Sequence, residues 1–158
     1  MFIKPFFHIS AGVWSVILEW LFIERLVISA VLGGLIGVER EMNSKPAGLR
    51  THILICMGAA MFTMISLSVA ENLGSSADVS RIAAGVVTGI GFLAAGSIFR
   101  EERIHGLTTA ADIWVIAAVG MAVGFGFYLF AVAATVISLA VLILGMPFNR
   151  WIAGRQPK

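Results

Sequence analysis

The sequence predicts an all-α fold: a polytopic transmembrane helical bundle of five spans, preceded by an amphipathic helix that lies in the membrane interface. Of the 158 residues, 59% are hydrophobic and 13% are charged, whereas about a quarter of the residues of a typical soluble domain are charged. The mean hydropathy is +0.96. Apolar stretches of about 20 residues, which is enough for a helix to cross a bilayer, recur along the chain.

The N-terminal interfacial segment is expected at residues 1–20. Its apolar residues fall at helical spacing on one face: Phe6, Ile9, Val13, Ile17 and Trp20. His8, Ser15 and Glu19 lie on another face, which is typical of an amphipathic helix in the plane of the interface. A spanning helix is the alternative, but it would leave the next apolar stretch short.

The transmembrane domain is expected at residues 21–148. Its five spans are placed at about residues 21–38, 51–70, 82–99, 108–123 and 127–145. The break between the last two spans is placed at Gly124-Phe125-Gly126, and Pro147 ends the last apolar run. Residues 149–158 form a short basic tail, and no soluble domain is expected after it.

Glycine residues predict where the spans pack together. Glycine weakens a soluble helix, but in a bilayer it lets neighbouring helices approach closely. The glycines expected to mediate helix packing are Gly33, Gly37, Gly85, Gly89, Gly96, Gly120 and Gly124. Because five short spans bury little surface, we expect a homo-oligomer, with a dimer favoured, or association with another membrane protein.

Basic residues predict the orientation of the spans. Eight of the 11 Lys and Arg residues lie in the connections after spans one and three or in the C-terminal tail. Connections rich in Lys and Arg stay in the cytosol. We therefore expect a cytosolic C-terminus and an N-terminus on the opposite side of the membrane.

Two segments of the chain resemble each other. Residues 34–51 and 91–109 each contain a glycine-rich helix end, an Arg-Glu pair and a Gly-Leu-x-Thr sequence. This similarity predicts a parallel repeat of two helix hairpins. The alternative is that unrelated membrane hairpins end and begin with the same residue types.

Charged and polar residues gather at the predicted cytosolic face, which makes this face the candidate binding or regulatory site. The cluster consists of Glu39, Arg40, Glu41, Arg50, His52, Arg100, Thr109 and Asp112. Three of its members lie near or inside the membrane boundary: Glu39, Arg50 and Asp112. Ionisable groups at this depth are costly unless they are paired, so we expect a partly buried network of these three residues, with Arg40 as a further candidate member.

Two interpretations of this network remain open. It is either a proton or cation site or a salt-bridge network that fixes helix register, and charge placement favours the second. Glu39 and Asp112 are the candidate Mg²⁺ ligands, since Mg²⁺ prefers one or two carboxylates; no other cofactor is expected. His52 and Cys56 have the spacing of a weak metal pair, which we interpret as a packing coincidence. The loop pairs Arg40–Glu101 and Arg100–Glu41 are also expected.

No motif predicts an enzyme or a nucleic-acid-binding protein. The sequence contains no G-x-S-x-G, H-E-x-x-H or G-x-x-x-x-G-K-[ST] motif. The formal net charge is only +2, and no run of Lys and Arg with interleaved aromatic residues occurs. We therefore expect membrane lipid and membrane proteins as partners, and neither nucleic acid nor catalysis.

Three stretches closely resemble the MgtC/SapB family of bacterial inner-membrane proteins: GGLIGVEREMNSKPAGLRTHILICMGAAMF, SRIAAGVVTGIGFLAAGSIFRE and GLTTAADIWVIAAVGMAVGFG. The resemblance covers about residues 21–142 and implies a periplasmic N-terminus and a link to growth in low magnesium and to stress adaptation. Two positions depart from the family pattern, with Gly85 in place of a polar amide and Ala95 in place of a glycine. Many members also carry a cytosolic regulatory domain after the fifth span, and functions located there are not expected here.

Two functions follow as hypotheses. The first is a small inner-membrane protein that regulates magnesium or ion homeostasis by docking against another membrane protein or a second copy. The alternative is a Mg²⁺ or H⁺ transporter or channel with a cytosolic Glu/Arg/Asp site. The glycine-rich faces favour the first hypothesis, whereas the repeat and the charged cluster favour the second.

Overall fold

A computed structural model describes residues 11–73, 78–100 and 104–153, and in these ranges the chain forms five helices. The helices are α1 (Ala11–Met42), α2 (Leu49–Leu73), α3 (Ser80–Gly96), α4 (Leu107–Gly124) and α5 (Tyr128–Ala153). A short antiparallel hairpin joins α3 to α4 and consists of β1 (Phe99–Arg100) and β2 (Ile104–His105). The all-α prediction is confirmed, with this hairpin as a small addition.

Four of the helices contain segments long and apolar enough to cross a membrane. These segments are Glu19–Met42, Leu49–Ala70, Leu107–Gly124 and Tyr128–Gly145. The fifth helix, α3, is apolar but has only 17 residues, so its length is about 26 Å against a hydrocarbon core of about 30 Å. It ends at Gly96, where Ser97 N–H donates back to the Ala94 carbonyl, and not at Phe99 as predicted.

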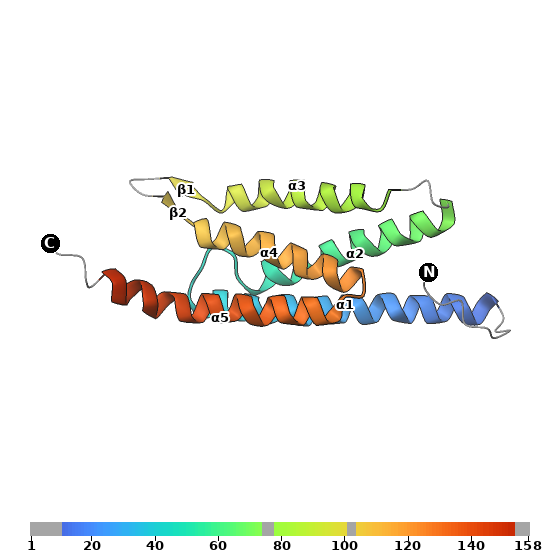
Figure 1. The fold of residues 1–158 in the computed structure, drawn as a ribbon, viewed down its shortest axis with the longest axis horizontal. Coiled ribbons are helices and arrows are strands. Elements are labelled where there is room, and N and C mark those ends of the chain that lie inside the picture. Colours follow the sequence, from blue (N-terminus) through green and yellow to red (C-terminus); the bar gives the residue numbers. More distant parts are fainter. Residues whose placement is uncertain (1–10, 74–77, 101–103, 154–158) are drawn as a thin grey trace.

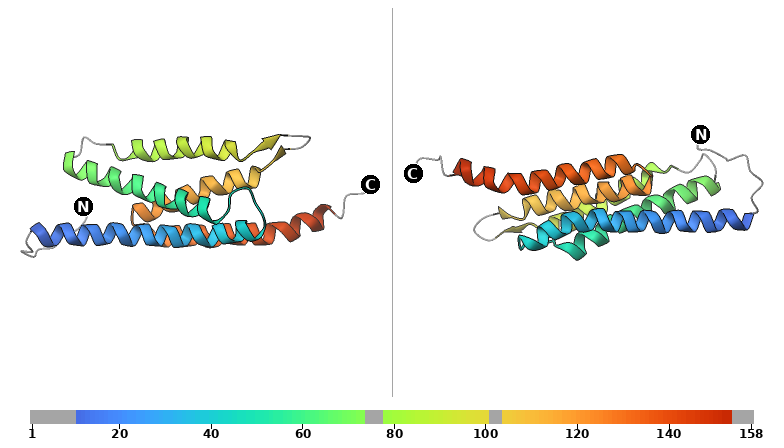
Figure 2. Two further views of the ribbon diagram at one scale, coloured as in Figure 1. Left: turned by 180° about the vertical axis from the view of Figure 1, so that it is seen from behind. Right: turned by 90° about the horizontal axis from the view of Figure 1, so that it is seen from below.

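The helices alternate in direction along the bundle. α1, α3 and α5 run one way, and α2 and α4 run the other way (Figures 1 and 2). The α1–α2 connection, the β-hairpin and the C-terminal end of α5 lie at one end of the bundle, which we call the hairpin end (Figure 1). The start of α1 and the α4–α5 turn lie at the opposite end, so the order of spans along the chain follows the prediction.

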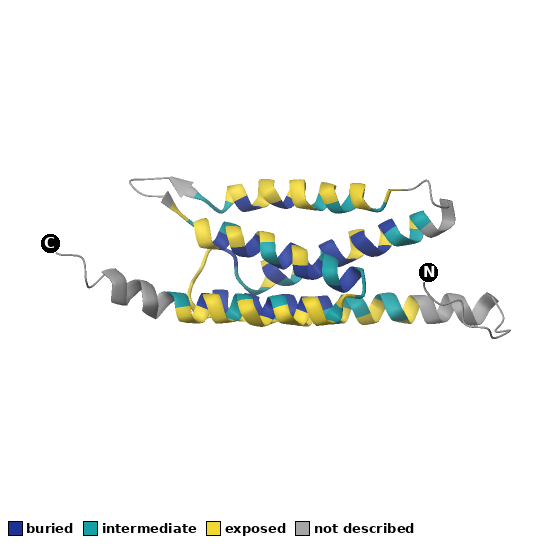
Figure 3. Ribbon diagram, viewed as in Figure 1, coloured by how far each residue is buried: buried dark blue, intermediate teal, exposed yellow. Residues whose placement is uncertain are grey.

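The core lies where α1, α2 and α4 meet. Ile36, Cys56, Ile116, Val119 and Val123 are almost completely buried there. The outer faces of the bundle remain apolar and exposed, most clearly along α5 and α3 (Figure 3). Apolar side chains exposed along several helices are typical of a protein surrounded by lipid.

The first and last described helices extend beyond the predicted first and last spans. Helix α1 is continuous from Ala11, so no break separates residues 11–20 from the first span. Residues 1–10 lie outside the described residues, and the interfacial position of the N-terminal segment stays a prediction. Helix α5 continues past Pro147 to Ala153, which is possible because transmembrane helices tolerate proline better than soluble helices do.

The two segments of the predicted repeat belong to the helix pairs α1–α2 and α3–α4. The first helices of the two pairs run in one direction and the second helices in the other (Figure 1). The two pairs differ in their connections. A turn containing Ser44 with φ of 51° follows α1, whereas the β-hairpin follows α3. They also differ in packing, because α2 lies closely against α1 while α3 lies at the edge of the bundle.

Candidate functional site

The last turn of α1 carries the central cation of the site, Arg40. Gly37 precedes it by three residues, and a Cβ atom there would lie 2.7 Å from Leu49 Cα. Residues three and four apart share a helix face. The close contact at Gly37 therefore directs Arg40 toward α2 and α4, where its side chain is only 4% exposed.

The first turns of α4 supply the partners of Arg40. Arg40 Nη2 donates a hydrogen bond to Thr109 Oγ1 at 3.0 Å, and Arg40 Nε lies 3.2 Å from Asp112 Oδ2. Thr109 and Asp112 are three residues apart, so one face of α4 presents both groups to the guanidinium. Removing one partner of a buried ion pair strongly destabilises the fold, because the other charge is left buried without compensation.

Helix α2 adds His52, which has no exposed surface. Its Nδ1 lies 2.8 Å from the Gly48 carbonyl oxygen, and its Nε2 lies 2.9 Å from Asp112 Oδ2. A carbonyl oxygen only accepts, so Nδ1 carries a hydrogen in this arrangement. The contact between Nε2 and the carboxyl then needs one more proton, located either on the imidazole or on Asp112.

Glu39 completes the cluster from the α1 side. Its Oε1 accepts a hydrogen bond from Asn43 Nδ2 at 2.8 Å, and its Oε2 lies 3.6 Å from Arg40 Nη1. Oε2 is buried and accepts no hydrogen bond. The five residues Glu39, Arg40, His52, Thr109 and Asp112 are all at least nine-tenths buried, and we call them the buried polar cluster.

The charges of the buried polar cluster compensate one another. Arg40 faces the two carboxyl groups of Glu39 and Asp112, and the His52 imidazole contacts Asp112 from α2. Each carboxyl group therefore has a cationic or hydrogen-bonding partner. Such compensation is what allows ionisable groups to stay buried at the end of a transmembrane bundle.

The structure assembles most of the predicted cluster but changes its central cation. Arg50 is exposed on α2, so the prediction that Arg50 joins Glu39 and Asp112 in the network is wrong. Arg40, the further candidate, is the cation that contacts both carboxyl groups. Glu41 is exposed, and its Oε2 accepts a hydrogen bond from Leu49 N–H at 3.0 Å at the start of α2. The side chain of Arg100 and the whole of Glu101 lie outside the described residues, and so do their predicted loop pairs.

Four of the seven glycines selected from the sequence lie at close contacts with α2. A Cβ atom at Gly33 would lie 2.7 Å from the His52 carbonyl oxygen, and one at Gly124 would lie 2.6 Å from Thr63 Cβ. At Gly120 a Cβ atom would overlap the Cys56 carbonyl oxygen, and at Gly37 it would lie 2.7 Å from Leu49 Cα. In contrast, a Cβ at Gly85, Gly89 or Gly96 would meet no atom within 4 Å, so the packing predicted for these three is absent within the described chain.

The described residues do not fit a Mg²⁺ site at Glu39 and Asp112. The guanidinium of Arg40 contacts both carboxyl groups and occupies the position where a cation would bind. Mg²⁺ would also need room for several water ligands.

Sequence reasoning missed one contact at the end of the bundle opposite the hairpin end. Arg25 Nη1 donates a hydrogen bond of 2.6 Å to the Gly124 carbonyl oxygen, at the C-terminus of α4. A cation is favourable there because of the helix dipole. The signal was available, since Arg25 lies within an apolar stretch and Gly126, with φ of 82°, marks a turn where helix carbonyls need partners.

Comparison with known proteins gives one family. The model of the MgtC family matches residues 26–151. YhiD of Escherichia coli K12, whose name presents magnesium transport as its suggested activity, is 52% identical over 129 residues, covering 77% of this chain and 59% of YhiD. Protein MgtC of Salmonella typhimurium LT2 is 43% identical over 124 residues, covering 78% of this chain and 52% of MgtC.

An uncharacterised protein of Haemophilus influenzae is 40% identical over 135 residues, covering 81% of this chain and 57% of that protein. The chain thus spans between half and three fifths of the length of these relatives. No solved structure matches the chain.

Proposed function

The chain belongs to the MgtC family, and from this premise we propose that it is a bacterial inner-membrane protein that regulates magnesium or general ion homeostasis during stress. In this proposal the bundle acts by docking against another inner-membrane protein or a second copy of itself, with a dimer favoured. It neither catalyses a reaction nor carries an ion through the buried polar cluster.

The observation that supports this proposal is the closed, charge-compensated state of the buried polar cluster. Arg40 pairs with Asp112 and with Glu39, so the carboxylates already have an internal cation. An ion-transport site needs groups that bind an ion and release it again, whereas these groups tie α1, α2 and α4 together. The cluster is therefore better suited to holding the hairpin end of the bundle in one shape.

A growth experiment tests the regulatory role. A strain that lacks the gene is grown across a range of magnesium concentrations and pH values, and is complemented with wild type or with Glu39→Gln. The variant keeps the side-chain size of Glu39, so we expect restored growth at normal protein levels. Arg50→Ala, which changes an exposed cation, is the matched control and is also expected to restore growth.

The alternative function is a Mg²⁺ or H⁺ transporter, and one observation favours it. Glu39 Oε2 is buried and accepts no hydrogen bond, which leaves it available to a proton. Purified protein in liposomes decides between the two functions. We expect no ion flux above that of empty vesicles, and flux that disappears in Glu39→Gln would establish the transporter instead.

The docking part of the proposal has its own test. Affinity purification from membranes and native mass spectrometry are expected to show a reproducible membrane-protein partner or a dimer. A monomer without any reproducible partner would contradict docking. The orientation is tested separately by labelling single cysteines, with the hairpin end expected to be accessible from the cytosol because it carries most of the basic residues.

A further inference from the structure

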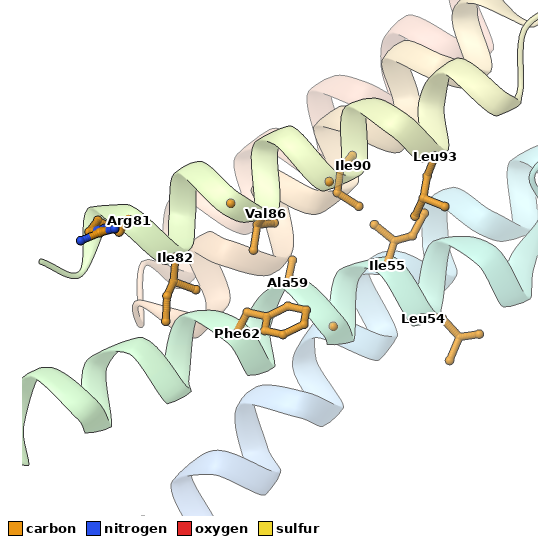
Figure 4. A pocket seen from close by; sticks show the side chains of 12 residues that line it. Leu54, Ile55, Ala59, Phe62, Arg81, Ile82, Val86, Ile90 and Leu93 are labelled. Atoms are coloured by element: carbon orange, nitrogen blue, oxygen red, sulfur yellow. The ribbon is translucent and has the colours of Figure 1, made fainter.

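An apolar groove of about 760 Å³ runs between α2 and α3, away from the buried polar cluster. Its lining side chains are almost all apolar and come from both helices (Figure 4). Arg81 lies at one end of the groove, and Leu54 and Leu93 lie at the other (Figure 4). Among the described residues, Arg81 is the one charged residue that lines it.

Glycine residues on both walls keep the groove open. Gly58 on α2 and Gly85 and Gly89 on α3 line it, and a Cβ atom at any of the three would meet no atom within 4 Å. None of the three therefore serves a helix contact within the described chain. Larger side chains at these positions would project into unoccupied space and reduce the volume of the groove.

The length of the groove matches one leaflet of a bilayer. Arg81 and Leu93 are 12 residues apart on α3, which is a distance of about 18 Å along a helix. The acyl chains of one leaflet occupy half of a hydrocarbon core of about 30 Å. An acyl chain that begins beside Arg81 would therefore extend along most of the groove.

The end of the groove at Arg81 is complementary to an anion. Arg81 is exposed in the first turn of α3, and the partial positive charge of a helix N-terminus adds to its charge. The N-cap residue of α3 is Val79, which makes no side-chain cap hydrogen bond. Among the described side chains the opposing charge nearby is Asp78, which accepts hydrogen bonds from Ser80 and interacts electrostatically with Arg81.

We propose that the α2–α3 groove binds one phospholipid, with an acyl chain lying against the glycine-lined walls and the phosphate paired with Arg81. The charge of Arg81 selects this occupant, because a lipid phosphate supplies the anion that an apolar partner helix lacks. The site is independent of the regulatory role proposed above.

The test is a titration of the full chain, purified in detergent, with phosphatidylglycerol, followed by native mass spectrometry. We expect one tightly retained lipid per chain. Arg81→Gln should weaken binding about fivefold, which corresponds to the loss of one basic residue near a lipid surface. Gly89→Leu fills the groove and should weaken binding about tenfold, as the loss of roughly two methylene contacts would do.

Two further variants sharpen the result. Gly91→Leu is the matched control, because Gly91 is equally open but does not line the groove, and it should bind lipid like wild type. Asp78→Asn removes the opposing charge and should strengthen binding. Equal lipid retention in Gly89→Leu and Gly91→Leu would overturn the proposal, and so would a dimer that Gly89→Leu dissociates without any loss of lipid.

Discussion

The three-helix unit of α1, α2 and α4 and the edge helix α3 use the same glycine spacing in opposite ways. Gly33 and Gly37 on α1 and Gly120 and Gly124 on α4 all face α2 at distances too short for a side chain. On α3, Gly85 and Gly89 have the same four-residue spacing and face open space. The three-helix unit is closed and contains the buried polar cluster, whereas α3 borders the α2–α3 groove.

The difference shows what glycine spacing does and does not encode. Four-residue spacing places two small residues on one helix face. Whether a helix, a lipid or another chain covers that face depends on the rest of the sequence. Helices α1 and α4 also carry polar side chains that need burial, Arg40 on α1 and Asp112 on α4. The pairing of these two side chains determines which helices pack against the glycine faces of α1 and α4. The glycine face of α3 is followed by no comparable buried group among the described residues.

The largest expected effect is from Arg40→Ala, which tests whether the closed unit depends on its cation. The substitution leaves Glu39 buried without a cation and leaves Asp112 with His52 alone as its partner, and breaking a buried ion pair in this way costs about 3 to 5 kcal/mol. The free energy of unfolding in detergent, measured by denaturant titration with circular dichroism, should fall by this amount.

The control for this prediction is Arg50→Ala, because Arg50 is exposed on α2. Substitutions at such surface positions usually change stability by less than about 0.5 kcal/mol. Equal losses of stability in the two variants would show that the closed unit does not depend on the contacts of Arg40.

A smaller effect is expected from alanine at the two kinds of glycine. Gly120→Ala places a Cβ atom against the Cys56 carbonyl oxygen, and overpacking of this kind costs about 1 to 3 kcal/mol. Gly89→Ala meets no atom within 4 Å and should stabilise α3 by up to about 1 kcal/mol through helix propensity. Thermal unfolding in the same detergent compares the two, and a loss at Gly89 as large as that at Gly120 would remove the contrast between the regions.

The smallest effect is expected at the open edge and depends on pH. Hydrogen bonds from the side chain and backbone N–H of Ser80 and the charge of Arg81 lower the pKa of Asp78 below its ordinary value of 3.8. A lowered folded-state pKa stabilises the fold above the unfolded pKa, and this contribution is lost as the pH falls through the folded-state value. Amide hydrogen exchange in the first turn of α3, corrected for the intrinsic rate, should therefore increase only below about pH 4.

Replacement of Asp78 by Asn provides the reference for this measurement. The variant cannot ionise, so exchange at the start of α3 should no longer respond to acid in this range. An unchanged acid response in Asp78→Asn would assign the effect to another group.

Much of the fold could be predicted from the sequence, because membrane spans are read from long apolar runs. Four predicted spans agree with the apolar helices to within a few residues. The end of α3 and the continuation of α5 through Pro147 were not predicted. Helix ends depend on local hydrogen bonds, such as the one from Ser97 N–H to Ala94, and these have no strong signal in composition.

Five of the eight predicted site residues form the buried polar cluster, but their pairing was not predicted. Depth in the membrane was judged from position in the chain, and this selected Arg50 over Arg40. Helix periodicity would have selected Arg40, because it follows Gly33 and Gly37 at spacings of seven and three residues and therefore shares their face. The contact between His52 and Asp112 joins residues 60 positions apart, and spacing within one helix could not reveal it.

The separation of these partners along the chain also has a consequence for biosynthesis. Arg40 and its acceptor Thr109 are 69 residues apart, and a ribosome takes roughly 3 to 14 s to add that many residues at about 5 to 20 residues per second. During this interval the first helix hairpin has been synthesised while the guanidinium has no partner on α4. Until α4 arrives, Arg40 has only the Glu39 carboxyl group of its own helix as an ionic partner, and the three helices close only after α4 supplies Thr109 and Asp112.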